Sequence, residues 1–239
     1  MRRSNRFRRF RLLASSGSLI CALAWATSTQ AEEGFEQQCQ NSVPQPFIEI
    51  EIRTAAPAIL HDRPLAEMTG TRADAAVTPQ AAYSRTDLGW TGRVGLNGFK
   101  SEDGTVCAKA SFRIELALGT EVVIAREVFE RPCLAELVLG HELEHISISE
   151  SNLRASADQL EQELGEAYAS RQLVGHESAL LQDLNRDVEE RWKPRLWTLI
   201  DEGDVRHRAL DARDKVKTFS ACGGGLARLL GRQHGIRKQ

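Results

Sequence analysis

The sequence has few aromatic residues and few prolines, and only one long apolar run. Aromatic residues make up 6% of its 239 positions, and proline occurs 7 times. Glycine, with 18 positions, and charged residues, at 27%, are close to the averages for globular proteins. This balance excludes a collagen-like, low-complexity or wholly disordered chain. The single apolar run excludes a protein with several membrane spans, so we expect one domain with a sizeable core.

That apolar run belongs to a predicted secretory signal peptide at residues 1–31. Six arginines precede leucine, isoleucine and alanine residues at 12–26. An Ala-Trp-Ala sequence at 24–26, or Thr-Gln-Ala at 29–31, offers a cleavage site. We therefore predict export to the periplasm or the extracellular medium, without a membrane anchor after cleavage. An uncleaved N-terminal anchor is the alternative, which the shortness of the apolar run disfavours.

The chain that remains after cleavage is acidic. Removing six of the 31 basic residues and none of the 33 acidic ones leaves a formal charge of about −8. This excess of acid argues against nucleic acid or an anionic membrane as the partner.

Four cysteines follow the predicted signal peptide, and an even number is typical of disulfides in exported proteins. If the chain folds back near residues 118–121, Cys107 comes to lie beside Cys133. By elimination Cys39 would then pair with Cys222. The alternative is that some of the four are free buried thiols.

The first half of the chain predicts strands. Phe47 to Ile52 alternates apolar and polar residues, which is typical of a half-buried strand. A short strand is expected around Trp90 to Leu96. Two further alternating runs, 108–118 and 121–128, predict a β-hairpin.

From Pro132 onward the pattern is helical. We expect a first helix up to Ile148, a break at Ser149 to Asn152, and a second helix from Asn152 to Leu173. Further helices are expected at about 176–192 and 194–217. The predicted class is α+β, with a small antiparallel sheet followed by a helical half. We assign residues 32–222 to one domain and 223–239 to a flexible basic tail.

The first predicted helix contains the motif HExxH, from His141 to His145. Residues four apart lie on one face of a helix, so both imidazoles can bind one metal ion, and zinc suits them best. Glu142 lies about a quarter turn away and could take a proton from a zinc-activated water as general base. The alternative is two hydrogen-bonded core histidines on a structural helix.

These residues resemble those of the zincin metallopeptidases. More narrowly, Phe47 to Leu173 is similar to bacterial exported proteins described as zinc-dependent proteases, although only HExxH is specific. The resemblance implies a zincin-like fold, Zn²⁺ as cofactor and hydrolysis of peptide bonds in a peptide or protein substrate. It also implies that the hairpin strands at 108–128 pair with an extended substrate.

The same resemblance implies a third zinc ligand. Ile148 and Ser151 occupy the positions at which metzincins require Gly and His, so that branch is excluded. In the gluzincin branch the ligand is a glutamate on the next helix. We expect Glu163, with Glu166 and Glu150 as alternatives.

His207 is a weaker candidate, for an oxyanion-stabilising donor. Asp204 and Asp211 flank it at i−3 and i+4 and could orient its ring, although a solvated helix face explains the same pattern. The expected function is thus an exported zinc metallopeptidase. The alternatives are a non-catalytic metal-binding or envelope interaction protein, and a disulfide-stapled helical adaptor without metal.

Overall fold

The computed structural model describes residues 35, 37, 39, 43–68 and 80–236. The chain divides into two compact units, Met1–Ser42 and Val43–Gln239, and every element below belongs to the second. The predicted signal peptide lies outside the described residues. In the described part of the chain, no helix is both long and apolar enough to cross a membrane.

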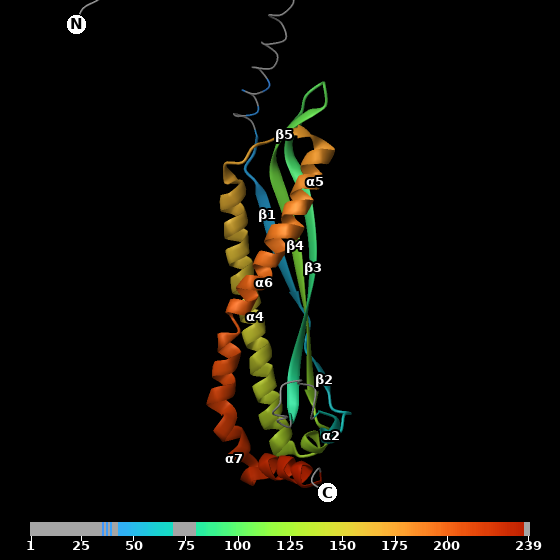
Figure 1. Cartoon of the computed structure of the whole chain (residues 1–239), viewed down its shortest axis with the longest axis vertical. Helices are drawn as coiled ribbons and strands as arrows, with labels where there is room; N and C mark the ends of the chain where they lie inside the picture. The colour runs from blue at the N-terminus through green and yellow to red at the C-terminus, as the bar shows by residue number, and fades with distance from the viewer. Residues whose placement is uncertain (1–34, 36, 38, 40–42, 69–79, 237–239) are drawn as a thin grey trace, which may run out of the picture. The chain divides into compact units, whose positions relative to one another are not determined.

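The second unit is α+β, as predicted, with a sheet covered on one face by helices (Figure 1). Its elements, in chain order, are β1 (Phe47–Thr54), β2 (Ala58–Leu60), α2 (Leu65–Met68), β3 (Ala82–Lys100), β4 (Thr105–Ile124), α3 (Arg126–Phe129), α4 (Pro132–Ala169), β5 (Leu173–His176), α5 (Glu177–Asp187), the π-helix η1 (Val188–Trp192), α6 (Lys193–Glu202) and α7 (Val205–Ile236).

Strand β4 is the centre of the sheet. Along one side it pairs antiparallel with the whole of β3. Along its other side it pairs in succession with β5 (antiparallel), β1 (parallel) and β2 (parallel). The strand predicted from the alternation at Phe47 to Ile52 is therefore present, as β1, and the one around Trp90 to Leu96 forms part of β3.

The predicted hairpin at 108–128 is wrong, because β4 continues through the expected turn. Gly119 pairs with Asp87 of β3, and the alternation of buried and exposed residues continues through Thr120. The hairpin instead joins β3 to β4, where Gly104 adopts a φ of 90° in the connection between the two strands. Glycine adopts this left-handed conformation without the steric cost that a Cβ would impose.

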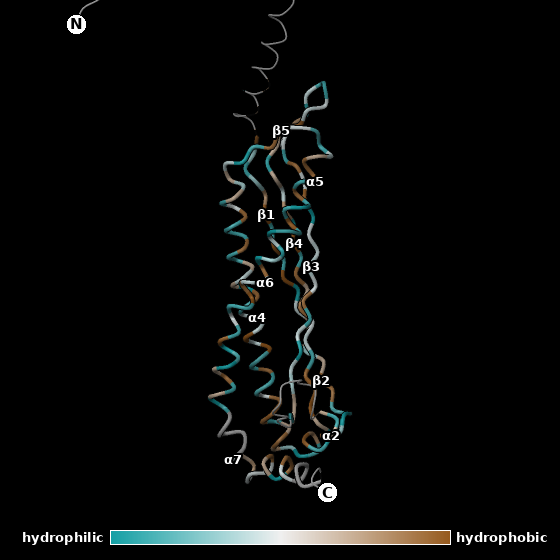
Figure 2. Tube along the Cα trace, in the orientation of Figure 1, coloured by the Kyte–Doolittle hydropathy of each residue, from teal (hydrophilic) through white to brown (hydrophobic). Residues whose placement is uncertain are grey.

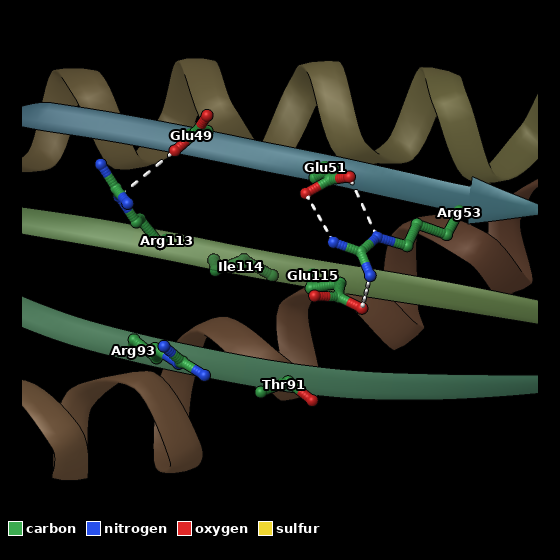
Figure 3. Close-up of a pocket in the computed structure, with 8 residues that line it drawn as sticks. All are labelled: Glu49, Glu51, Arg53, Thr91, Arg93, Arg113, Ile114 and Glu115. Atoms are coloured by element: carbon green, nitrogen blue, oxygen red, sulfur yellow. Dashed lines mark hydrogen bonds and ion pairs between the residues drawn. The ribbon is translucent and has the colours of Figure 1, made fainter.

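The two faces of the sheet differ in polarity. Every second residue of β4 from Ala110 to Leu118 is buried against the helices, where Leu153, Leu160 and Leu164 of α4 complete the core. Apolar positions recur at intervals along α4, as its colouring in Figure 2 shows. The other face carries an exposed ladder of charges formed by Glu49, Glu51, Arg53, Arg113 and Glu115 (Figure 3).

Helix α4 is one continuous helix of 38 residues, so the predicted break at Ser149 to Asn152 is wrong. The Ser149 hydroxyl donates a hydrogen bond to the backbone carbonyl of His145, one turn earlier, at 3.1 Å. Asn152 is buried where α4 meets Gly203, at the end of α6. Both residues would suit a helix end, but here the serine is hydrogen-bonded and the asparagine is packed inside a helix.

Helix α7 packs antiparallel to α4 and changes direction near its end (Figure 1). Cys222, Gly223 and Gly224 have φ values of 52°, 62° and 72°, which break the helix. The residues after them, expected to be a loose tail, are helical as far as Ile236. Leucines 226, 229 and 230 are buried there in a second core cluster that includes Val138.

The disulfides differ from the prediction. Cys133 at the start of α4 is bonded to Cys222, with the two Cα atoms 6.0 Å apart. Cys39 and Cys107 each also take part in a disulfide. Neither predicted pairing forms, because β4 runs straight for 17 residues beyond Cys107, roughly 55 Å of extended chain. This places Cys107 far from Cys133.

Candidate metal centre

Helices α4 and α7 each present a pair of side chains, four residues apart, to the other. On α4 the pair is His141 and His145, whose side chains are 19% and 13% exposed. On α7 the pair is His207 and Asp211. Because residues i and i+4 share a helix face, two such pairs on packed antiparallel helices converge on one point.

Three atoms of this group lie close enough together to share a metal ion. His145 Nε2 is 3.2 Å from His141 Nε2 and 2.9 Å from Asp211 Oδ1. His141 Nε2 is 3.4 Å from the same carboxylate oxygen. Atoms that bind zinc tetrahedrally at 2.0–2.2 Å lie roughly 3.3–3.6 Å from one another. The group His141, His145 and Asp211 could therefore hold a metal ion.

The other ring nitrogen of His141 is held by a network of charged side chains. His141 Nδ1 lies 3.3 Å from Asp214 Oδ2. Arg213 donates to both oxygens of Asp214, at 2.8 and 2.9 Å, and to both oxygens of Glu144, at 2.9 and 2.7 Å. The hydrogen bond from Arg213 holds the pKa of Asp214 well below its usual range. Asp214 thus stays ionised and can orient His141 as carboxylates orient metal-binding histidines.

The other ring nitrogen of His145 begins a second network. His145 Nδ1 is 2.8 Å from His207 Nδ1, and His207 Nε2 is 3.4 Å from the Ser149 hydroxyl. Burial, followed by the charge of His145, lowers the pKa of His207, which favours its neutral form. If His145 Nε2 binds a metal, its Nδ1 carries the proton and donates to His207 Nδ1. His207 then donates from Nε2 to the Ser149 hydroxyl, so the ring N–H of His145 and that of His207 each have an acceptor.

Glu142 faces a different neighbour. It is 8% exposed and is hydrogen-bonded to Ser84 of β3. Burial raises its pKa, while this hydrogen bond and the charges of His141 and His145 act in the opposite direction. The structure therefore places Glu142 against the sheet, on a side of α4 that differs from the side packed on α7.

The structure does not bring Glu163, the expected third ligand, to the histidines. It lies 18 residues beyond His145 on the same continuous helix, a separation of about 27 Å at 1.5 Å per residue. Its carboxylate instead accepts two hydrogen bonds from Arg195, at 2.8 and 2.9 Å. This ion pair lowers the pKa of Glu163.

The two alternatives to Glu163 are also outside the group. Glu166 lies still further along α4 and accepts a hydrogen bond from Gln162 at 2.8 Å. Glu150 is five residues beyond His145, so its side chain leaves α4 about 140° around the axis from the histidine. The carboxylate that joins the two histidines is that of Asp211 on α7. Its only signal in the sequence is its four-residue spacing from His207, which equals the spacing of the two motif histidines.

No family model matches this chain. No curated protein and no solved structure matches it either. The resemblance to zincins thus depends on the HExxH motif itself.

Proposed function

We propose that this chain is a zinc-binding protein whose metal ion joins α4 to α7. The observation that carries the proposal is the approach of His141 Nε2, His145 Nε2 and Asp211 Oδ1 to within 2.9–3.4 Å of one another. Without a metal, the two Nε2 atoms face each other at 3.2 Å, so one of them must be protonated. A metal ion replaces that proton and accepts all three lone pairs.

The chemistry of the ligands favours zinc. Two neutral imidazoles and one carboxylate are the donor types of zinc sites, whereas magnesium and calcium prefer oxygen donors alone. Asp211 is 63% exposed, so the site is accessible from solvent and a fourth position can remain open for exchange. The disulfides of the chain support an oxidising compartment, and we propose the periplasm or the extracellular medium.

A second candidate function is hydrolysis of peptide bonds at this centre. Two observations favour it. Burial raises the pKa of Glu142, a direction that suits a carboxyl group acting as general base. Within the described residues, β4 is the only strand paired with β3, so the outer edge of β3 can pair with an extended peptide. The substrate-pairing role predicted for 108–128 thus moves to β3, because β4 is paired on both sides.

In this candidate, zinc supplies Lewis acidity and lowers the pKa of a coordinated water. Glu142 would take the proton, which requires its carboxylate to turn away from Ser84. Peptide or protein, rather than nucleic acid, remains the proposed partner of the acidic chain.

The test measures zinc content and peptidase activity in the same preparations. We expect about one zinc per chain by elemental mass spectrometry, and none in a His141→Ala/His145→Ala variant. A wild type without zinc after reconstitution would contradict the proposal. Glu142→Gln separates the candidates, with Glu150→Gln as control. A peptidase loses hydrolysis of a fluorescent casein only in Glu142→Gln and keeps its zinc in both. If the zinc-loaded wild type does not cleave casein, the peptidase candidate is excluded and the chain is a non-catalytic zinc-binding protein.

A further inference from the structure

A cavity of about 350 Å³ lies beside the metal centre, between the sheet and the helices. It shares two residues with the hydrogen-bond network of His145, namely Ser149 and His207. Its walls come from five elements and the connection before α7. Besides Ser149 and His207, its lining includes Thr86 and Leu88 of β3, Leu118 of β4, Leu153 of α4, Trp197 of α6 and Asp204.

The lining is apolar in part and acidic in part. Leucine and isoleucine side chains line it together with the ring of Trp197, which is 38% exposed. Asp204 adds a carboxylate, and the lining contains neither lysine nor arginine. The side chain of Asp87 lies on the opposite face of β3 from those of Thr86 and Leu88, and it forms an ion pair with Arg85 there at 3.2 Å. Among the described residues, no basic side chain forms an ion pair with Asp204, so its charge is available to a ligand.

One wall of the cavity is fixed by close packing. Asn152 is buried, and a Cβ at position 203 would collide with its side-chain amide, so a larger residue there would displace Asn152. This contact holds the end of α6, and thus Asp204 after it, against α4. The acidic side of the cavity is therefore preorganised, which reduces the entropic cost of binding.

We propose that this cavity binds the side chain of an arginine or lysine in an extended peptide. Both side chains combine an apolar stem, which would pack on Trp197 and the leucines, with a cation, which would reach Asp204. The volume is at the small end of ligand pockets and suits one side chain. The peptide backbone would pair with the outer edge of β3, whose residues Thr86 to Leu88 form one wall.

The inference rests on the proposed function in one respect. Because His207 is both a wall of the cavity and the neighbour of His145, a peptide held here would pass beside the metal centre. Binding itself uses none of the three metal ligands, so it does not require the metal.

The experiment compares three acetylated, amidated pentapeptides with a central arginine, leucine or glutamate between alanines. Their dissociation constants are measured by NMR titration of the full predicted mature chain, with and without zinc. We expect the arginine peptide to bind about threefold to fivefold more tightly than the leucine peptide, the ratio of a partly exposed ion pair. The glutamate peptide should bind more weakly than both.

Three variants locate the preference. Asp204→Asn should abolish the preference for arginine, and Asp204→Lys should reverse it in favour of glutamate. Asp158→Asn, which removes the same charge from an exposed position of α4 outside the cavity lining, should leave it unchanged. Equal binding of all three peptides, no binding of any, or equal effects of Asp158→Asn and Asp204→Asn would overturn the inference. Zinc content measured on the same samples shows separately whether the metal proposal holds.

Discussion

Replacing Asp211 by asparagine should weaken zinc binding without unfolding the chain. Asparagine has nearly the same shape as aspartate but no negative charge, and Asp211 is 63% exposed, so the packing of α7 is little affected. The carboxylate oxygen lies 2.9 and 3.4 Å from the two imidazole nitrogens that would complete the site. Loss of an anionic ligand is expected to cost more than loss of an outer-shell partner, and therefore at least about 100-fold in affinity.

This loss can be measured as a thermal shift. A 100-fold weaker affinity removes about 2.7 kcal/mol of zinc-dependent stabilisation when zinc is in large excess. At roughly 2–4 °C per kcal/mol for a domain of this size, the zinc-induced rise in Tm should be about 5–11 °C smaller in Asp211→Asn. Scanning calorimetry at a fixed zinc concentration measures both proteins. If the variant gains as much stability from zinc as the wild type does, Asp211 is not a ligand.

Three further predictions concern His207, Glu163 and Tyr168. His207→Leu should weaken zinc binding about 10-fold to 100-fold, whereas His207→Asn should retain most of the affinity because it keeps an acceptor for the proton on His145 Nδ1. Competition with a chromophoric chelator measures the zinc affinity of both variants, and equal affinities of the two would refute the positioning role. Glu163→Gln should leave zinc affinity unchanged and lower stability at neutral pH. Because Arg195 lowers the pKa of Glu163 in the folded state, this stabilisation is present above the usual glutamate pKa of about 4.3 and is lost as pH falls through the lower folded value. The free energies of unfolding of the wild type and Glu163→Gln, measured with urea, should therefore become equal in acid. Burial and the hydrogen bond to Asp187 raise the pKa of Tyr168 to about 12, so its contribution to stability is present below pH ~10 and declines as pH rises towards 12. A Tyr168→Phe variant should therefore lose less stability than the wild type between pH ~10 and 12, and an equal loss in the two proteins would contradict this.

Features set by short stretches of sequence were predictable. Strict alternation from Phe47 to Ile52 identified β1, and the helical pattern from Pro132 onward identified the start of α4. The two motif histidines also form the α4 half of the candidate site. Each of these patterns depends on residues only a few positions apart, so no knowledge of distant contacts was needed.

The errors arose where distant contacts decide the local structure. Ser149 and Asn152 have the chemistry of a helix break, but Asn152 is held by packing against Gly203, 51 residues later. Once a break was expected, folding back of the second helix brought Glu163 towards the histidines. A continuous helix removes that possibility, because it separates them by about 27 Å.

Asp211 illustrates the same limit at the site. In the sequence it belongs to a charge-rich helix, and such helices are usually solvated. Only the packing of α7 on α4 brings it to His141 and His145. The repeated four-residue spacing of His207 and Asp211 is the one local signal that points to a shared centre.

X-ray absorption at the zinc edge tests the central claim most directly, because it counts the ligands of the bound ion. We predict two imidazoles and one carboxylate oxygen within about 2.0–2.2 Å of zinc in the wild type, with no sulfur. The carboxylate contribution should disappear in Asp211→Asn and persist in Glu163→Gln. A zinc ion with fewer than two imidazoles, or one whose spectrum changes in Glu163→Gln and not in Asp211→Asn, would contradict a metal centre between α4 and α7.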